Sequence, residues 1–255
     1  MKRLETIEEI LMGKRNLVET KEFNAWINGI YGHFEDALYD SLFEKKSKFL
    51  IWRAPDVYFI TMIDSILTKD SATRESLESL VTERLMGWHR ISIWSCMAAY
   101  HGSYESVARE LRFLIEDAVQ ALRADQKNPD ATIDEKLEWL EMNRLRGKTL
   151  IDATELALDL KSQLKDVYHE LCDFVHPSVE LIQRDIENRR ILFKYDENYF
   201  DKMFDFHTRV FDLVLALILH RFPYAIEEFL EYQSIEELEK DGYNSSIAII
   251  GYHMK

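Results

Sequence analysis

Hydrophobic and polar positions along this chain follow the 3.6-residue period of amphipathic α-helices. Between residues 20 and 46 an apolar residue recurs every three or four positions, and the same period returns at 73–99, 103–124 and 152–175. Residues 198–221 are apolar on nearly every side, which is typical of a helix at the centre of a bundle. The pattern predicts an all-α, multi-helix bundle around this central helix.

Residues that begin and end helices support this pattern. Thr132-x-x-Glu135 and Ser234-x-x-Glu237 are capping boxes, in which a hydroxyl and a carboxylate bond the free N–H groups at a helix start. Pro177 ends the helix at 152–175, because the residue before a proline is displaced from helical geometry. Further helices are predicted at 6–13, 55–68, 178–188 and 224–232.

The chain offers few positions for a domain boundary. It has 255 residues but only 8 Gly and 4 Pro, fewer than a many-stranded sheet needs for its turns. We expect residues 1–255 to form a single helical domain, with 71–232 as the bundle core and 1–70 as a subsidiary N-terminal helical layer. The segment 125–130 (DQKNPD) is the best candidate for a linker between helices, and residues 246–255 are predicted as a short β-prone tail.

Charge limits the partners that this chain is expected to bind. It carries 46 Asp+Glu against 32 Lys+Arg, a formal net charge of −14, and most of the acidic excess follows residue 128. Binding along nucleic acid needs many clustered basic side chains, so we expect no extended DNA-binding surface. Residues 189–195 (RRILFKY) have a net charge of +3, so the sequence is still compatible with a small basic pocket that binds RNA or a nucleotide. Neither common Gly-rich phosphate motif occurs, and no cofactor is predicted.

The cysteines and the N-terminal residues predict a cytoplasmic location. Cys96 and Cys172 form no C-x-x-C motif, so we expect free thiols in a reducing compartment. The first residues, MKRLETIEEILMGK, carry acidic side chains where a signal peptide has an apolar run. The longest apolar run, 213–219, is far shorter than the roughly 20 residues that cross a bilayer, so no membrane partner is expected.

One face of the helix at 152–175 carries candidate chemistry. His169 and Cys172 lie on it, and His176 follows at the predicted helix end. Because a free cysteine is usually buried, we expect this face to meet a second layer, a pocket or another subunit, which favours a homo-oligomer or a protein partner. His169, Cys172 and His176 are also the candidate ligands of a metal site, although no second ligand motif accompanies them.

Two further positions have both a structural and a functional interpretation. In the helix at 103–124, Arg109 and Arg112 each have a carboxylate four positions away, which fits either a solvated face with ion pairs or a lined pocket. His207, in the central helix, is predicted to be a buried histidine with satisfied hydrogen bonds rather than a functional one.

The segment 168–178 (YHELCDFVHPS), together with the helix at 103–124, resembles HEPN-type helical proteins over roughly residues 100–220. That superfamily consists of compact α-bundles, many of them RNases or accessory modules of toxin–antitoxin and phage-defence systems. Its signature is an Arg and, after four to six intervening residues, a His at the end of a long helix. His176 matches the His, whereas the upstream positions hold Leu171, Glu170 and His169 instead of the Arg.

The resemblance implies a metal-independent RNase in which the His transfers protons and the Arg positions phosphate, often across a dimer interface. His176 would then be the general acid/base, with phosphate contact from Arg109, Arg112 or the 189–190 arginine pair. Glu170 completes the candidate catalytic set. Because the usual Arg is missing, we expect a degenerate, non-catalytic member rather than an active nuclease.

Two functions follow from these observations. The first is an intracellular helical interaction or regulatory protein that self-associates, as a degenerate HEPN-like module of a defence or toxin–antitoxin system. The alternative is a metal-independent RNase or nucleotide-binding enzyme, with His176 as general acid/base and Arg109 and Arg112 at the phosphate. A metal-dependent variant of this enzyme is the third.

Overall fold

The structure, a computed structural model, describes residues 21–67, 77–175 and 194–254. Within these ranges every regular element is a helix, which confirms the all-α prediction. In chain order the helices are α3 (Lys21–Lys45), α4 (Lys48–Trp52), α5 (Ala54–Leu67), α7 (Leu80–Tyr100), α8 (Tyr104–Lys127), α9 (Ile133–Met142), α10 (Gly147–Asp152), α11 (Leu158–Val175), α13 (Glu197–Arg221), the 3₁₀ turn η1 (Pro223–Ala225), α14 (Ile226–Tyr232), α15 (Ile235–Lys240) and α16 (Asn244–His253).

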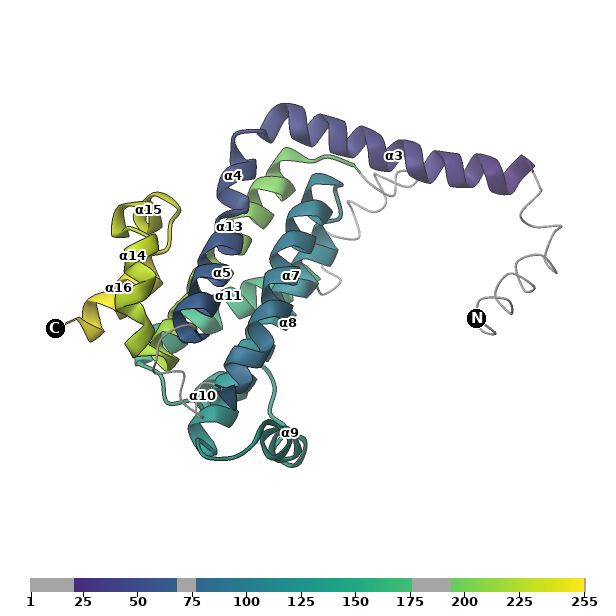
Figure 1. The fold of residues 1–255 in the computed structure, drawn as a ribbon. Coiled ribbons are helices and arrows are strands. Elements are labelled where there is room, and N and C mark those ends of the chain that lie inside the picture. The colour runs from purple at the N-terminus through teal and green to yellow at the C-terminus, as the bar shows by residue number, and fades with distance from the viewer. Residues whose placement is uncertain (1–20, 68–76, 176–193, 255) are drawn as a thin grey trace, which may run out of the picture.

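The central helix is α13, as the sequence predicts (Figure 1). Every side chain from Val210 to Leu219 is buried, because α7, α8, α11 and α16 all pack against this helix. A helix that is apolar on all sides has no face for solvent and is stable only when neighbours surround it.

Helices α7 and α8 form an antiparallel hairpin whose turn contains Gly102. This glycine has a φ of +74°, and a Cβ atom there would lie 2.6 Å from the carbonyl oxygen of Lys194. Glycine is therefore required both by the backbone conformation and by the close approach of the chain that leads into α13.

The second half of α3 packs on the end of α7, whereas its first half extends beyond the bundle (Figure 1). Phe34 stacks on His101 with ring centroids 3.7 Å apart, and Ser41 donates a hydrogen bond to the carbonyl oxygen of Tyr100. Lys45 forms ion pairs with α13, one of them 2.8 Å from the Glu197 carboxylate. The following helices enter the core itself, where Trp52 of α4 and Phe59 of α5 are fully buried. The predicted division at residue 70 into a layer and a core remains a prediction.

The β-prone tail was predicted wrongly, because residues 244–253 form helix α16. The Asp212 carboxylate accepts hydrogen bonds from the first N–H groups of α16, and Ile250 is buried against the bundle. Tertiary packing and a helix cap from a distant residue outweigh the β-propensity of the isoleucines.

Two boundaries also differ from the prediction. The helix expected at 152–175 is interrupted between α10 and α11, where the backbone N–H of Glu155 donates to Gln126 Oε1 at 2.9 Å. The predicted linker at 125–130 is wrong at its start, because α8 continues to Lys127 and Asp125 is buried within it. Both differences arise from contacts between segments far apart in the sequence.

Other predictions concern residues outside the described ranges, namely the helices at 6–13 and 178–188 and most of the segment 189–195. None of the helices in the described ranges combines the length and the apolar composition that crossing a membrane would require.

Candidate functional site

Those predicted site residues that the structure describes lie on two neighbouring helices, α8 and α11, which run antiparallel. At one end Lys127 Nζ lies 2.6 Å from the carboxylate of Glu155, just before α11 begins. Further along, Tyr168 Oη donates a hydrogen bond of 2.5 Å to Glu116 Oε1. As the residue number falls along α8 it rises along α11, and these two contacts fix the register between the helices.

The same register places Arg112 beside Cys172. Arg112 precedes Glu116 by one helical turn and Cys172 follows Tyr168 by one turn, so both lie along the same seam. Burial, the hydrogen bond to Glu116 and the neighbouring Cys172 raise the pKa of Tyr168 above its ordinary value. Within the described ranges no ion pair joins Arg112 to Glu116, whose carboxylate is bonded to Tyr168 instead.

Arg109 lies one further turn toward the end of α11, which is Val175. Its side chain is exposed. His176 follows Val175 directly in the chain but lies outside the described residues, as do the arginines at 189–190. The structure therefore brings Arg109 and Arg112 to the end of the bundle where α11 ends.

Glu170, the remaining candidate, is on another side of α11 and faces α13. Its two carboxylate oxygens accept hydrogen bonds of 2.7 and 3.0 Å from the guanidinium of Arg209. This pair lowers the pKa of Glu170, and a second carboxylate, Asp205, lies 3.2 Å from Arg209. The candidate catalytic residues thus do not meet at one point, because Glu170 is engaged away from the Arg109–Arg112 seam.

The candidate metal ligands are only partly described. His169 Nδ1 lies 3.8 Å from Asp173 Oδ1, both side chains are largely exposed, and Cys172 is half-buried. Across the described residues, no three His, Cys, Asp or Glu side chains gather closely enough to hold a metal ion. His176 is not among the described residues.

Aromatic side chains hold together the end of the bundle near Arg109. The Tyr104 ring stacks on Tyr199 with centroids 6.0 Å apart, and Phe174 meets Tyr199 edge-on at 5.6 Å. Tyr104 Oη also accepts a hydrogen bond of 2.9 Å from the backbone N–H of Asp196. The first turns of α8 and α13 and the last turn of α11 are therefore fixed relative to one another.

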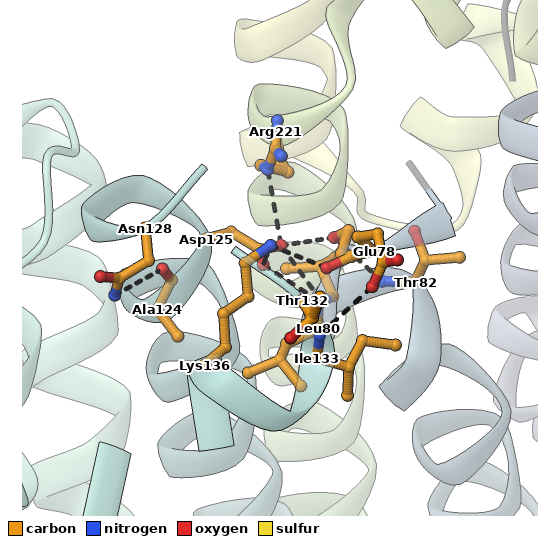
Figure 2. Close-up of polar contacts among 12 residues, drawn as sticks. Glu78, Leu80, Thr82, Ala124, Asp125, Asn128, Thr132, Ile133, Lys136 and Arg221 are labelled. Atoms are coloured by element: carbon orange, nitrogen blue, oxygen red, sulfur yellow. Dashed lines mark hydrogen bonds and ion pairs between the residues drawn. The ribbon is translucent and has the colours of Figure 1, made fainter. Parts of the chain in front are cut away.

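A buried ionic cluster, absent from the sequence prediction, centres on Asp125 (Figure 2). Its carboxylate lies 3.0 Å from Lys136 Nζ and 3.5 Å from Arg221 Nε. It also accepts the backbone N–H groups of Leu80 and Val81 at 3.0 and 3.3 Å, so it caps the first turn of α7. The cluster joins α7, α8, α9 and α13 and is structural.

Asp212 caps the start of α16 in the same way. Its carboxylate accepts the backbone N–H groups of Ser245 and Ser246, each at 2.8 Å, and the Ser246 hydroxyl at 2.8 Å. Burial raises the pKa of Asp212, and these hydrogen bonds oppose that effect. The sequence carries no local signal for either aspartate cap, because each aspartate is more than thirty residues from the N–H groups that it accepts.

His207 is buried, as predicted. It is hydrogen-bonded to the backbone of Ser92, and its ring lies between Trp52 and Phe211 at centroid distances of 5.1 and 4.5 Å. Burial lowers the pKa of His207 to about 3, so the neutral form is present at physiological pH. Its Nε2 atom has no hydrogen-bond partner among the described residues, so the prediction of satisfied hydrogen bonds holds for only one of the two ring nitrogens.

A different kind of candidate surface lies on α5 and α7, which pack side by side. Each helix presents one narrow stripe to solvent, with residues spaced three or four apart. We call these two stripes together the α5–α7 face; its members are Arg53, which immediately precedes α5, with Val57, Ile60, Asp64 and Leu67 of α5, and Glu83, Met86, Arg90, Trp94 and Met97 of α7. Trp94, the largest of them, is 51% exposed.

The described residues define the class of protein as an all-α helical bundle packed around one central helix, α13. Comparison with family models, with curated proteins and with solved structures gives no match.

Proposed function

We propose that this chain is an intracellular helical interaction protein that self-associates, a degenerate HEPN-like module of a defence or toxin–antitoxin system. The observation that supports self-association best is the concentration of large exposed apolar side chains on α3, α5 and α7. Tyr39 and Phe43 of α3 are 72% and 76% exposed, and Trp94 and Met97 of α7 are each 51% exposed. Large apolar side chains that remain exposed on helices in contact with one another, as α3 and α5 are with α7, are typical of protein–protein contact surfaces.

Sedimentation velocity of the full chain tests this function. We expect the weight-average sedimentation coefficient to rise with protein concentration, because weak self-association shifts toward dimer by mass action. A sedimentation coefficient of the monomer at every concentration, together with no cross-linked dimer after chemical cross-linking, contradicts self-association.

A metal-independent RNase is the second candidate, and one specific observation favours it. The register between α8 and α11 puts Arg112 on the seam beside Cys172 and Arg109 toward Val175, the residue before His176. Two guanidinium groups near a histidine are suited to hold a phosphate while the imidazole transfers a proton.

RNA cleavage by the wild type and by His176→Ala, Arg109→Ala and Arg112→Ala variants tests the second candidate. If the chain is this RNase, each substitution lowers the cleavage rate at least ten-fold, and EDTA leaves it unchanged. An Asp159→Asn variant is the matched control, since Asp159 is an exposed carboxylate in the first turn of α11, at the opposite end of that helix from Val175. Equal cleavage by wild type and His176→Ala, or no cleavage by either, excludes the enzyme.

A further inference from the structure

We infer that the α5–α7 face is a two-fold interface between two copies of this chain. This inference rests on the proposed self-association and names the surface that performs it. Its basis is the order of charged and apolar side chains along the face, which makes the face complementary to itself.

The register between α5 and α7 is fixed by contacts beneath the face. His89 Nε2 lies 3.4 Å from Asp56 Oδ1, which joins the first turn of α5 to the middle of α7. Arg53 lies close enough to Cys96 to affect the pKa of its thiol, which places the start of α5 beside the last turns of α7. The two helices therefore run antiparallel, and each level of α5 has a known level of α7 beside it.

This register groups like charges at opposite ends of the face. Asp64 near the end of α5 lies at the level of Glu83 near the start of α7, so this end is acidic. Arg53, whose Nε also forms an ion pair with the neighbouring Asp56 carboxylate, lies at the opposite end, level with Trp94, and Arg90 lies between the centre and that end.

The apolar side chains fill the middle of the face and its flanks. Ile60 and Met86 lie at the same level on the two helices and are 54% and 53% exposed. Val57 follows on α5 toward the basic end, and Trp94 and Met97 continue the apolar surface on α7. A second copy would remove these side chains from water, which is the main favourable contribution to association.

A second copy of the chain is the occupant that the charge order selects. A two-fold axis running across both helices lays α5 against α5 and α7 against α7, each pair antiparallel. The acidic end of one copy then meets the basic side of the other, so that Glu83 approaches Arg90 and Asp64 approaches Arg53. An arrangement that brings the acidic ends of the two copies together places carboxylates next to carboxylates, and this repulsion disfavours it.

The size of the face predicts a weak dimer. Fourteen residues of α5 span about 21 Å at about 1.5 Å per residue, so two adjacent helices offer on the order of 400 Å² per copy, or about 800 Å² in total. This area is smaller than the roughly 1,000 Å² or more of stable specific interfaces and is in the range of weak, transient contacts. We therefore expect dissociation in the micromolar range, with monomer and dimer both present.

Sedimentation velocity of the full chain over about 1 to 200 µM, compared with variants of the face, tests the inference. Trp94→Glu and Ile60→Glu should each raise the dissociation constant at least ten-fold, because each replaces an exposed apolar side chain of the face with a carboxylate. Leu158→Glu is the matched control: Leu158 is 82% exposed on α11 and should leave the dissociation constant unchanged. Far-UV circular dichroism establishes that each variant is folded.

A charge exchange supplies the more specific test. Glu83→Arg and Arg90→Glu should each weaken the dimer several-fold. The double variant should restore the dimer, because the arginine introduced in one copy then faces the glutamate introduced in the other. The two introduced side chains face each other only if the copies are related by the proposed axis. If the wild type dimerises but no variant of the face changes the dissociation constant, another surface is responsible; this inference fails and the proposed self-association stands. If the wild type is monomeric throughout, both fail.

Discussion

The Nζ atom of Lys136 lies 3.0 Å from Oδ1 of Asp125, and neither side chain reaches solvent. Lys136 also donates a 2.7 Å hydrogen bond to the carbonyl oxygen of Glu78, just before α7. The pair thus joins α9 to the start of α7 and the end of α8. A charge buried in this way is stabilised only while its partner is present.

Replacing Asp125 should therefore be costly. We expect Asp125→Asn to lower the free energy of unfolding by about 3 kcal/mol, because it leaves the Lys136 ammonium buried without its counter-charge. Urea denaturation measures the loss, and the exposed Asp134→Asn on α9 is the control, expected to change stability by less than about 0.5 kcal/mol. Similar values for the two variants would show that the ion pair contributes little.

The turn between α7 and α8 gives a second prediction. Gly102→Ala should lower the free energy of unfolding by at least about 2 kcal/mol, since its φ of +74° disfavours a Cβ that would also meet the Lys194 carbonyl oxygen at 2.6 Å. Gly87 in the middle of α7 has open space around its Cα, so Gly87→Ala should stabilise the helix by up to about 1 kcal/mol. Thermal unfolding of the two variants should shift in opposite directions. A shift of the same sign in both would contradict this.

Helix α16 depends on a carboxylate from another helix. Asp212→Ala removes the acceptor of the Ser245 and Ser246 N–H groups, and we expect it to cost about 2 kcal/mol. Hydrogen exchange followed by mass spectrometry should show faster exchange confined to the peptide covering 244–253. The control is Asp205→Ala, on the exposed side of α13. Unchanged protection of α16 in Asp212→Ala would mean that packing alone maintains this helix.

Helix positions were predictable from the sequence wherever the apolar period was long. The periodic pattern located α3, α8 and α13 to within a few residues, because their apolar faces are continuous. The tail at 246–255 was predicted wrongly because its conformation depends on Asp212, which is more than thirty residues away. The break before Leu158 depends likewise on contacts of Glu155 with the end of α8.

The candidate site was predictable only in part. Spacing on one helix showed that Arg109 and Arg112 share a face, but only the Tyr168–Glu116 contact shows that this face adjoins α11. Glu170 was placed with them because it lies near His176 in the sequence, whereas its orientation is set by Arg209 of α13. The order of charges on the α5–α7 face likewise depends on an interhelical register that no local pattern contains.

The buried histidine of α13 predicts how stability depends on pH. Burial lowers the pKa of His207 to about 3, against about 6.5 in an unfolded chain. Between these values the unfolded chain binds a proton that the folded chain does not, so the stabilisation is complete above about pH 6.5 and is lost progressively as the pH falls toward 3. At pH 5.5 the free energy of unfolding should be about 1.4 kcal/mol lower than at alkaline pH from this residue alone.

Urea denaturation at several pH values between about 4.5 and 7 measures this dependence. In His207→Leu the slope of unfolding free energy against pH should be smaller than in the wild type, although the absolute stability also changes because the hydrogen bond to Ser92 is lost. Burial also lowers the pKa of His220, so His220 contributes to the pH dependence of stability in both proteins. Leu158→Ala, at an exposed position of α11, changes no titratable group and should keep the wild-type slope. Equal slopes in wild type and His207→Leu would show that His207 binds its proton equally in the folded and unfolded chains.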